Sequence, residues 1–351
     1  MKEKRVTLKD VANATKVSLG TVHRALTDKE GVSDQLKNEI LQKARQMGYI
    51  TNSVASSLKR KTIKIAVVFP GMTEENRYFY PYVWNGVREF AKEIRDFNFE
   101  MTEVVYYGSF SSQIQSLEEV YENYGSSLDG LITIAHGGND IAKSINKFVS
   151  IGVSVVLVCD DSPVSNRLCC VRADDFTNGK LAAELLCHYI PQRSKIFVAA
   201  GDVDISSHSN SVRGFEQYMT DYSSDKEVIK YHNYEDQNEL YSTVRDLILK
   251  YDDLNGLYSC NARNTITLCK VVMDLDRVGD IKIIGTDIFD ESISLLKKGV
   301  VQTIIYKNPY EQAYIGFKTL FEYIFKNVKP LKSTIYVDST LVLKSNVEFY
   351  T

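Results

Sequence analysis

The sequence predicts a small all-α head joined to a larger α/β body of two lobes. Helix signals are closely spaced in the first sixty residues, whereas short apolar runs alternate with amphipathic segments from residue 63 onward. Residues 1–62 carry 13 Lys and Arg against 6 Asp and Glu, although the whole chain has a net charge of −3. We therefore expect a basic head, residues 1–50, a linker, residues 51–62, and an acidic body, residues 63–351.

The composition is 44% apolar and 25% charged, which is typical of a globular protein and excludes disordered, collagenous and disulfide-framework classes. No apolar run reaches the roughly 20 residues that cross a bilayer, and no apolar segment follows the charged start. We expect a cytoplasmic protein that makes no membrane contact. The six cysteines include no CxxC pair and have no His or carboxylate at ligand spacing, which predicts buried thiols, no metal and no cofactor.

Three helices are predicted in the head, and each follows a side chain that can cap it, namely Thr7, Ser18 and Ser33. Apolar residues recur after these caps at helical spacing and predict helices over 8–14, over 19–26 and from Ser33 to Gly48. About four residues link the first two helices. The head is therefore predicted to be a helix-turn-helix unit.

The second helix of such a unit enters the major groove of DNA with its N-terminal residues toward the base edges. Because Val22 and Ala25 are expected to face the core, the residues exposed there are Leu19, Gly20, His23 and Arg24. The guanidinium of Arg24 suits bidentate recognition of guanine. Residues suited to positioning phosphates are Thr7, Ser18 and Thr21. The alternative is a helical domain that docks another protein.

The segment VTLKDVANATKVSLGTVHRAL, followed by GVSDQLKNEILQKARQMGYITNSVASSLK, resembles the DNA-binding head and hinge of the lac repressor and purine repressor family of bacterial transcription regulators. The resemblance places Leu19 and Gly20 at variable base-reading positions and Arg24 at a guanine-reading position. Gly20 has no side chain to read a base, and His23 stands where serine is common.

The resemblance also implies a hinge whose matching residues are Asn52, Ala55 and Leu58. Such a short segment is not a stable helix alone, and it would fold only when two subunits bind a palindromic operator in double-stranded DNA. Leu58 would then wedge between base steps and kink the duplex. The alternative is that Leu58 is an ordinary apolar anchor in the linker.

Alternating apolar and amphipathic segments in the body predict parallel sheets covered by helices on both faces. The expected strands are 63–69, 100–107, 129–135, 153–159, 195–201, 256–260 and 281–287. The expected helices are 82–95, 111–124, 139–150, 176–189, 210–222, 237–251, 263–275, 290–298 and 310–326. This span is too long for one sheet domain, which predicts two lobes.

The motifs GxGxxG, GxxxxGK[ST], GxSxG and HExxH are absent, so we do not expect an enzyme. The body resembles the two-lobed, periplasmic-binding-protein-like sensor of the same family through DGLI, ADDFTNGKLAAELL, RGF, GLYSCNA, IGTD and LKKGVVQTIIYKNPYEQA. The last stretch resembles ribose-type sugar-binding proteins. The resemblance implies chain crossovers near residues 160, 287 and 307, with a ligand cleft between the lobes where strands end.

The resemblance places ligand-binding side chains at Phe79, Tyr80, Asn261, Asp287 and Asn308. Aromatic faces suit the C–H groups of a sugar ring, and carboxylate and amide groups suit its hydroxyls. His136 and Arg263 are further candidates. Where the family often has a ligand-binding arginine, this sequence has Ser211, with Asn210 beside it and Arg213 two residues further along the helix, about 200° around it.

Together these features predict a homodimeric DNA-binding regulator, which we expect to be a repressor. Its operator affinity should change when a small carbohydrate biases the angle between the lobes. No heptad tail follows the last strand, which favours a dimer over a tetramer. The alternatives are a sugar-binding module without DNA-linked output, a small-molecule kinase or hydrolase, and a regulator whose cleft binds a protein partner.

Overall fold

The structure is a computed structural model that describes residues 6–26, 30–47, 62–73, 76–108, 110–136, 138–223, 225–233 and 236–350. The chain divides into a head that ends at Lys61 and a body that begins at Thr62. The predicted helix end at Gly48 and the predicted hinge residues Asn52, Ala55 and Leu58 lie outside the described residues. Within the described ranges, no helix combines the length and the apolar character needed to span a membrane.

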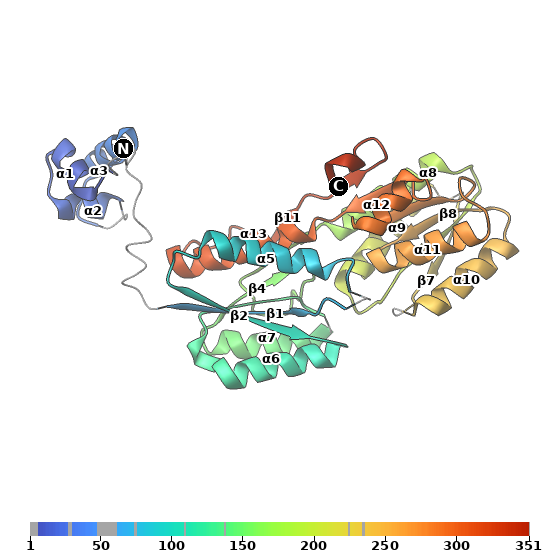
Figure 1. The fold of residues 1–351 in the computed structure, drawn as a ribbon, viewed down its shortest axis with the longest axis horizontal. Coiled ribbons are helices and arrows are strands. Elements are labelled where there is room, and N and C mark those ends of the chain that lie inside the picture. The colour runs from blue at the N-terminus through green and yellow to red at the C-terminus, as the bar shows by residue number, and fades with distance from the viewer. Residues whose placement is uncertain are drawn as a thin grey trace. The chain divides into compact units, whose positions relative to one another are not determined.

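The head contains the three predicted helices, α1 (Leu8–Thr15), α2 (Leu19–Leu26) and α3 (Asp34–Gln46), shown in Figure 1. Each begins at its predicted cap, because the side-chain oxygens of Thr7, Ser18 and Ser33 accept hydrogen bonds from backbone N–H groups three residues on, at 3.3, 3.1 and 3.4 Å. The Asp10 carboxylate accepts in return from the Thr7 N–H at 2.8 Å, which completes a capping box. The buried core of the head consists of Val11, Ala12, Val22, Ala25, Ile40 and Ala44.

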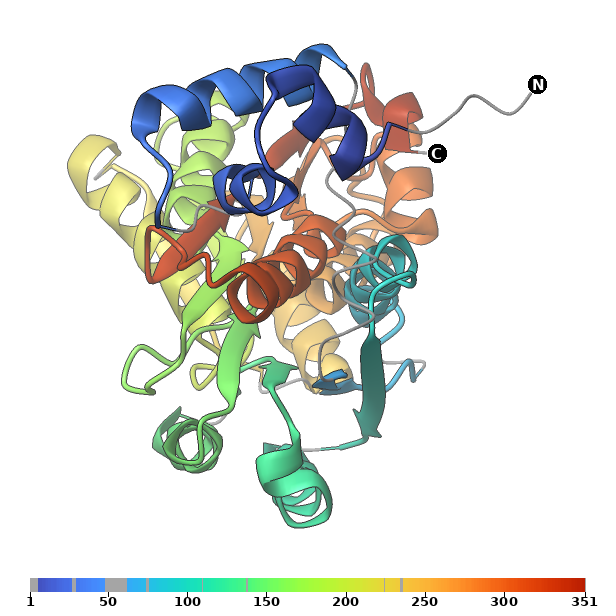
Figure 2. The same cartoon turned by 90° about the vertical axis from the view of Figure 1, so that its left-hand side faces the viewer.

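The first lobe of the body contains a parallel sheet with the strand order β11-β5-β4-β3-β1-β2. Its strands are β1 (Ile63–Pro70), β2 (Phe99–Tyr106), β3 (Gly130–Thr133), β4 (Ser154–Val158), β5 (Cys169–Ala173) and β11 (Thr334–Val337). Helices α5 (Tyr80–Glu93) and α13 (Pro309–Lys326) cover one face, and α6 (Phe110–Tyr124) and α7 (Gly138–Ser150) cover the other (Figures 1 and 2). A short 3-10 turn, Gly125–Ser127, follows α6. Apolar residues on both faces of the central strands are buried, as expected for a covered parallel sheet.

The second lobe contains a sheet with the order β12-β10-β9-β8-β6-β7, parallel except for the β10–β12 pair. Its strands are β6 (Lys195–Ala199), β7 (Glu227–Tyr231), β8 (Leu254–Ser259), β9 (Lys282–Thr286), β10 (Thr303–Tyr306) and β12 (Thr340–Val342). Helices α8 (Asp175–Tyr189) and α9 (Ser206–Tyr222) pack on one face. The other face carries α10 (Gln237–Lys250), α11 (Ala262–Asp274), α12 (Asp290–Lys297) and the 3-10 turn Val347–Tyr350.

Helices α8 and α9 approach each other closely because glycines stand at their contact. A Cβ atom on Gly179 of α8 would lie 1.9 Å from the backbone oxygen of Ser211, and one on Gly214 of α9 would lie 1.9 Å from the backbone oxygen of Phe176. Only glycine fits such a backbone approach. The crossing fixes how the N-terminal ends of both helices meet the cleft.

The predicted strands and helices are confirmed with end shifts of up to four residues, and the two-lobed α/β fold is also confirmed. Strands β5, β7, β10, β11 and β12 were not predicted, because they are short and most carry no continuous apolar run. The chain crosses between lobes after β5, between β10 and α13, and between β11 and β12. The crossover near 307 was therefore predicted correctly.

The crossovers predicted near 160 and 287 were wrong. Residue 160 leads from β4 into β5, which pairs with β4 in the same sheet. Residue 287 follows β9, and the chain continues through α12 to β10, which pairs with β9. In both places the next strand belongs to the same sheet, so the chain stays in the same lobe. Besides the crossover near residue 307, the chain passes between the lobes at residues 173–175 and 338–339.

Candidate functional site

The exposed face of α2 matches the sequence prediction. Leu19 is 48% exposed, and Gly20, His23 and Arg24 are also exposed, while Val22 and Ala25 are buried. The Arg24 side chain passes near Gly31, whose added Cβ would lie 3.7 Å from an Arg24 Nη atom. Polar and apolar side chains are thus exposed on one face of a helix whose other face is buried in the core.

The three predicted phosphate-positioning residues also have local roles. The Thr7 hydroxyl donates to the Asp10 carboxylate at 2.6 Å, and the hydroxyls of Ser18 and Thr21 are 2.8 Å apart. Thr7 and Ser18 are exposed, and Thr21 is half-buried. Their side chains therefore order the first turns of α1 and α2.

A cleft of about 790 Å³, part of it open to solvent, lies between the two lobes of the body. It is lined at the carboxyl ends of strands from both sheets, the position expected for a ligand in such folds. Six of the predicted ligand-binding residues line it: Phe79, Tyr80, His136, Asn261, Arg263 and Asp287. The rings of Phe79 and Tyr80 meet edge to face with centroids 5.4 Å apart at the start of α5.

The other three predicted ligand-binding residues do not line the cleft. Asn210 and Arg213 are one turn apart on α9, and the Arg213 guanidinium donates to the Asn210 side-chain oxygen at 3.0 Å and lies over the Phe176 ring. Asn308 caps α13: its side-chain oxygen accepts from the Glu311 N–H at 3.2 Å and its amide donates to the Glu311 carboxylate at 2.7 Å. Asn210 and Asn308 are thus held by neighbours along the chain, and Arg213 contacts Asn210 on α9 and Phe176 on α8.

Several lining residues were missed by the sequence analysis as ligand-site candidates. They include Asn76, Tyr78, Asp160, Asp175, Ser207, His208, Gln237, Asn264, Lys307 and Gln312. A usable signal existed for some of them, since Asp160 follows the apolar run of β4 and Lys307 follows that of β10. The others come from loops and helix starts that only the tertiary structure brings to the cleft.

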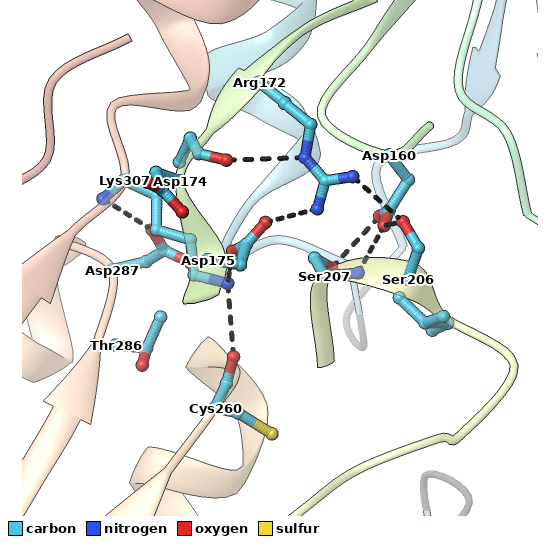
Figure 3. A network of polar contacts seen from close by, with 12 residues as sticks. Asp160, Arg172, Asp174, Asp175, Ser206, Ser207, Cys260, Thr286, Asp287 and Lys307 are labelled. Atoms are coloured by element: carbon cyan, nitrogen blue, oxygen red, sulfur yellow. Dashed lines mark hydrogen bonds and ion pairs between the residues drawn. The ribbon is translucent and has the colours of Figure 1, made fainter. Parts of the chain in front are cut away.

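Asp160 joins the two lobes at the base of the cleft. It follows β4 in the first lobe and is 5% exposed, and its carboxylate accepts from the Ser206 hydroxyl at 2.8 Å and from the Ser207 N–H at 2.7 Å at the start of α9 (Figure 3). The His136 ring lies 3.3 Å from the same carboxylate. Burial alone would raise the pKa of Asp160, but the hydrogen bond and charge of His136, with Arg172 nearby, hold it below its usual value.

Asp175, at the start of α8, bridges two buried cations. One oxygen accepts from the Arg172 guanidinium at 2.7 Å, and the other lies 3.1 Å from the Lys307 ammonium, which also donates to the Cys260 carbonyl at 3.3 Å (Figure 3). Burial opposes charge on both cations, yet Asp175 raises the pKa of Arg172 and of Lys307. Both side chains therefore remain charged next to Asp175.

Asp287 and His208 are buried lining residues whose pKa values move away from their usual range. Burial raises the pKa of Asp287 to about 6, although the Lys307 ammonium and its backbone N–H, 3.3 Å from the carboxylate, oppose this change. Burial and the charge of Lys307 lower the pKa of His208 to about 3. The His208 ring nitrogen accepts from the Asp202 N–H at 3.1 Å, which agrees with a neutral ring.

The mouth of the cleft is bridged by contacts between the lobes. The Arg77 guanidinium lies 2.8 Å from the Glu291 carboxylate, and the rings of Tyr78 and Phe289 have centroids 4.6 Å apart. The Arg263 guanidinium donates to the Asn76 side-chain oxygen at 3.2 Å. Three of these residues, Asn76, Tyr78 and Arg263, also line the cleft, so the two lobes contact each other across it.

One wall of the cleft rests on a network of amides from the loop before α10, the start of α10 and α11. Asn264 and Asn233 exchange two hydrogen bonds at 2.9 and 3.1 Å, and the Gln237 amide donates to the Asn264 oxygen at 3.0 Å. The Thr267 hydroxyl donates to the Gln237 oxygen at 2.6 Å. Because each amide is held by another, the side chains of Gln237 and Asn264 are oriented before any ligand binds.

The fold and the cleft define a two-domain protein: a helix-turn-helix unit followed by a two-lobed body of the periplasmic-binding-protein type. Residues 65–327 match the periplasmic binding protein domain, and residues 7–52 match the bacterial regulatory proteins of the lacI family. The chain therefore carries a lacI-family DNA-binding domain followed by a periplasmic binding protein domain, the combination that the sequence analysis had inferred.

Two curated relatives match across most of this chain. The ribose operon repressor of Bacillus subtilis is 24% identical over 292 residues, which is 82% of this chain and 82% of that protein. The regulator GntR of Escherichia coli K12 is 25% identical over 266 residues, 74% of this chain and 75% of that protein. These relatives are transcriptional regulators.

The body also resembles solved structures of solute-binding proteins. A solute-binding protein of an ABC transporter from Burkholderia graminis, in complex with D-arabinose, has a TM-score of 0.74 and 18% sequence identity, and covers 83% of this chain and 98% of its own. At this identity the likeness establishes the fold of the body.

Proposed function

We propose that the protein is a transcriptional repressor that binds operator DNA through α2 and senses a small sugar in the interlobe cleft. One observation carries the proposal. A helix-turn-helix unit with an exposed α2 face is joined to a body whose cleft is lined by aromatic rings of the first lobe and by hydroxyl-binding groups of both lobes. The protein acts as a homodimer in the cytoplasm and has no catalytic activity of its own.

The DNA-binding part of the proposal rests on the face of α2. Arg24 reads a guanine in the major groove, and Leu19 meets a thymine methyl, because both side chains are exposed at the helix while its other face is buried. The backbone N–H groups at the helix starts near Thr7 and Ser18 hold phosphates. Two heads on a two-fold operator order the hinge at Asn52, Ala55 and Leu58, and Leu58 opens a central base step.

The sugar-sensing part rests on the chemistry of the lining. The rings of Phe79 and Tyr80 offer apolar faces to C–H groups, and Asn261 and Asp287 offer groups for hydroxyls. The relatives agree with this chemistry, since one is named a ribose operon repressor and a similar structure holds D-arabinose.

The coupling between ligand and DNA follows from where the lining residues come from. His136 and the Phe79–Tyr80 pair belong to the first lobe, whereas Asn261 and Asp287 belong to the second. A sugar that contacts both sides favours one angle between the lobes and so shifts the population of the form that holds the two hinges at operator spacing. The shift is limited by the difference in sugar affinity between the two forms.

The DNA-binding proposal is tested by selecting a preferred duplex from random DNA with the full-length protein, followed by anisotropy titrations at fixed salt. Arg24→Ala should weaken binding to the selected duplex by about 5- to 150-fold, from the roughly 1–3 kcal/mol of one bidentate base contact. Lys43→Ala, which removes an exposed cation from α3, is the matched control. Equal losses for both variants on selected and random duplexes would contradict base reading by Arg24.

The sugar-sensing proposal is tested by adding D-ribose, D-arabinose, D-glucose and D-galactose to the complex with the selected duplex. At least one sugar should raise the thermal midpoint of the protein and change its operator affinity in the same concentration range. If a sugar binds but leaves DNA affinity unchanged, the coupling is wrong. If none binds, the cleft is not a sugar sensor.

A further inference from the structure

The positively charged groups at the base of the cleft are already matched by carboxylates of the chain. Three features there could hold an anion: the N-terminus of the 17-residue helix α9, the Arg172 guanidinium and the Lys307 ammonium. Helix N-termini and buried cations are the usual partners of phosphates and carboxylates in proteins. What occupies these features therefore decides which ligand charge the cleft accepts.

The N-terminus of α9 is occupied by Asp160. The carboxylate receives the Ser207 N–H at 2.7 Å, the Ser206 hydroxyl at 2.8 Å and the Ser207 hydroxyl at 3.2 Å, and His136 lies 3.3 Å away. Asp160 comes from the opposite lobe, so a residue of the first lobe sits where a ligand anion would bind on the second (Figure 3). Its lowered pKa keeps it charged at neutral pH.

The two buried cations share a single carboxylate. Asp175 is 2% exposed and contacts Arg172 at 2.7 Å with one oxygen and Lys307 at 3.1 Å with the other. Lys307 also donates to the Cys260 carbonyl, and its backbone N–H donates to the Asp287 carboxylate. An incoming phosphate that contacts either cation would therefore meet the Asp175 carboxylate beside it.

The buried charges at the base do not leave a positive excess. Asp160, Asp175 and Asp287 bring three carboxylates, whereas Arg172 and Lys307 bring two cations. His208, with its pKa lowered to about 3, is neutral at pH 7. Even a protonated His136 would bring the sum only to zero.

Arg263 is a further cation in the lining, and it lies at the mouth instead of the base. It is half-buried, and its guanidinium donates to the Asn76 side-chain oxygen across the mouth. Solvent near the mouth screens its charge. It cannot offset an anionic group buried beside the three carboxylates.

We propose that the cleft selects an uncharged polyhydroxylated ligand and excludes the phosphorylated or carboxylated forms of the same ligand, because Asp160 and Asp175 already fill the positions that would hold an anion. This inference rests on the proposed sugar-sensing function and specifies the charge of the sugar. Burying an unpaired charge is unfavourable by several kcal/mol, whereas hydroxyls can bind to the fixed carboxylates and amides at no such cost.

The test compares matched pairs with the full-length wild-type protein by calorimetric titration at constant ionic strength. The pairs are D-ribose and D-ribose 5-phosphate, D-glucose and D-glucose 6-phosphate, and D-glucose and D-glucuronate. In any pair that binds, the neutral sugar should bind at least about 100-fold more tightly than its anionic partner. An anionic partner that binds equally well or better would overturn the inference while leaving sugar sensing intact. If no member of any pair binds, the proposed sugar sensing fails, and the inference fails with it.

A second measurement examines the carboxylates directly. Asp175→Asn removes the charge that neutralises Arg172 and Lys307, so inorganic phosphate should raise the thermal midpoint of this variant in a concentration-dependent way. Wild type and Asp140→Asn, which removes an exposed carboxylate of α7, should show no such rise over potassium chloride of the same ionic strength. A phosphate-specific rise in wild type as large as that in Asp175→Asn would overturn the inference. If Asp175→Asn does not fold, the wild-type titrations of paired sugars decide.

Discussion

Asp287 should make the folded body more stable in mild acid than at neutral pH. Its side chain is 3% exposed in the cleft, and burial raises its pKa from 3.8 to about 6. The charged groups that act on it are Lys307, which opposes the rise, and Asp175, which adds to it. The folded protein therefore binds a proton at Asp287 over a pH range in which the unfolded chain has lost it.

The sign and size of the effect follow from this difference. Between pH 4 and pH 6 the folded state holds more protons than the unfolded state, so the contribution of Asp287 to stability is fully present below about pH 4 and is lost as pH rises through about 6. A difference of about two pKa units, at about 1.4 kcal/mol per unit, corresponds to about 3 kcal/mol.

The assay is urea unfolding of the full-length protein followed by circular dichroism between pH 4 and pH 7.5, with Asp287→Asn as the variant. The stability of wild type relative to the variant should increase by about 3 kcal/mol as pH falls from 7 to 4. Groups such as His208, which titrate in both proteins, cancel in the difference. Asp290→Asn removes an exposed carboxyl three residues further on and is the matched control. A flat difference, or one in which wild type loses relative stability in acid, would refute the reasoning.

Three further predictions concern packing. Gly179→Ala should destabilise the body by about 1–3 kcal/mol in urea unfolding, because the new Cβ would lie 1.9 Å from a backbone oxygen of α9; an unchanged midpoint would show that the helices can separate freely. Gly20→Ala should stabilise the head by about 1 kcal/mol, since the nearest atom to the new Cβ is 3.7 Å away and alanine favours a helix. Amide hydrogen exchange of the full chain measures the stability of the head, and faster exchange in the variant would contradict the prediction. Phe289→Ala removes the ring contact with Tyr78 across the cleft mouth. It should weaken sugar binding by about 3- to 10-fold, from the roughly 0.5–1.5 kcal/mol of an aromatic pair. A calorimetric affinity equal to that of wild type would show that the contact does not support closure.

The head could be predicted from sequence because its determinants are local. The cap at Thr7 and its partner Asp10 are three residues apart, and Val22 and Ala25 repeat at helical spacing, so one turn of chain contains the whole signal. The structure places the same residues in caps and core. The exposed face of α2 then follows by exclusion.

The cleft could be predicted only in part. The family resemblance placed Phe79, Tyr80 and Asp287 among the ligand-binding residues. They reach the cleft because the carboxyl ends of parallel strands meet at one edge of a sheet. Arg213 and Asn308 carry suitable polar groups too, but each binds a neighbour in its own helix. A sequence pattern does not show which of two possible partners a side chain takes.

By itself the sequence determined the helix-turn-helix head and the two-lobed α/β body, because caps and periodicity are set by residues close together in the chain. Its resemblance to a known family indicated six of the residues that line the cleft. The tertiary structure alone decided that Asp160 of one lobe binds the start of α9 in the other and that Asp175 joins Arg172 to Lys307. These contacts connect residues up to 132 positions apart, and the charge that a ligand meets in the cleft depends on which buried groups pair across that separation.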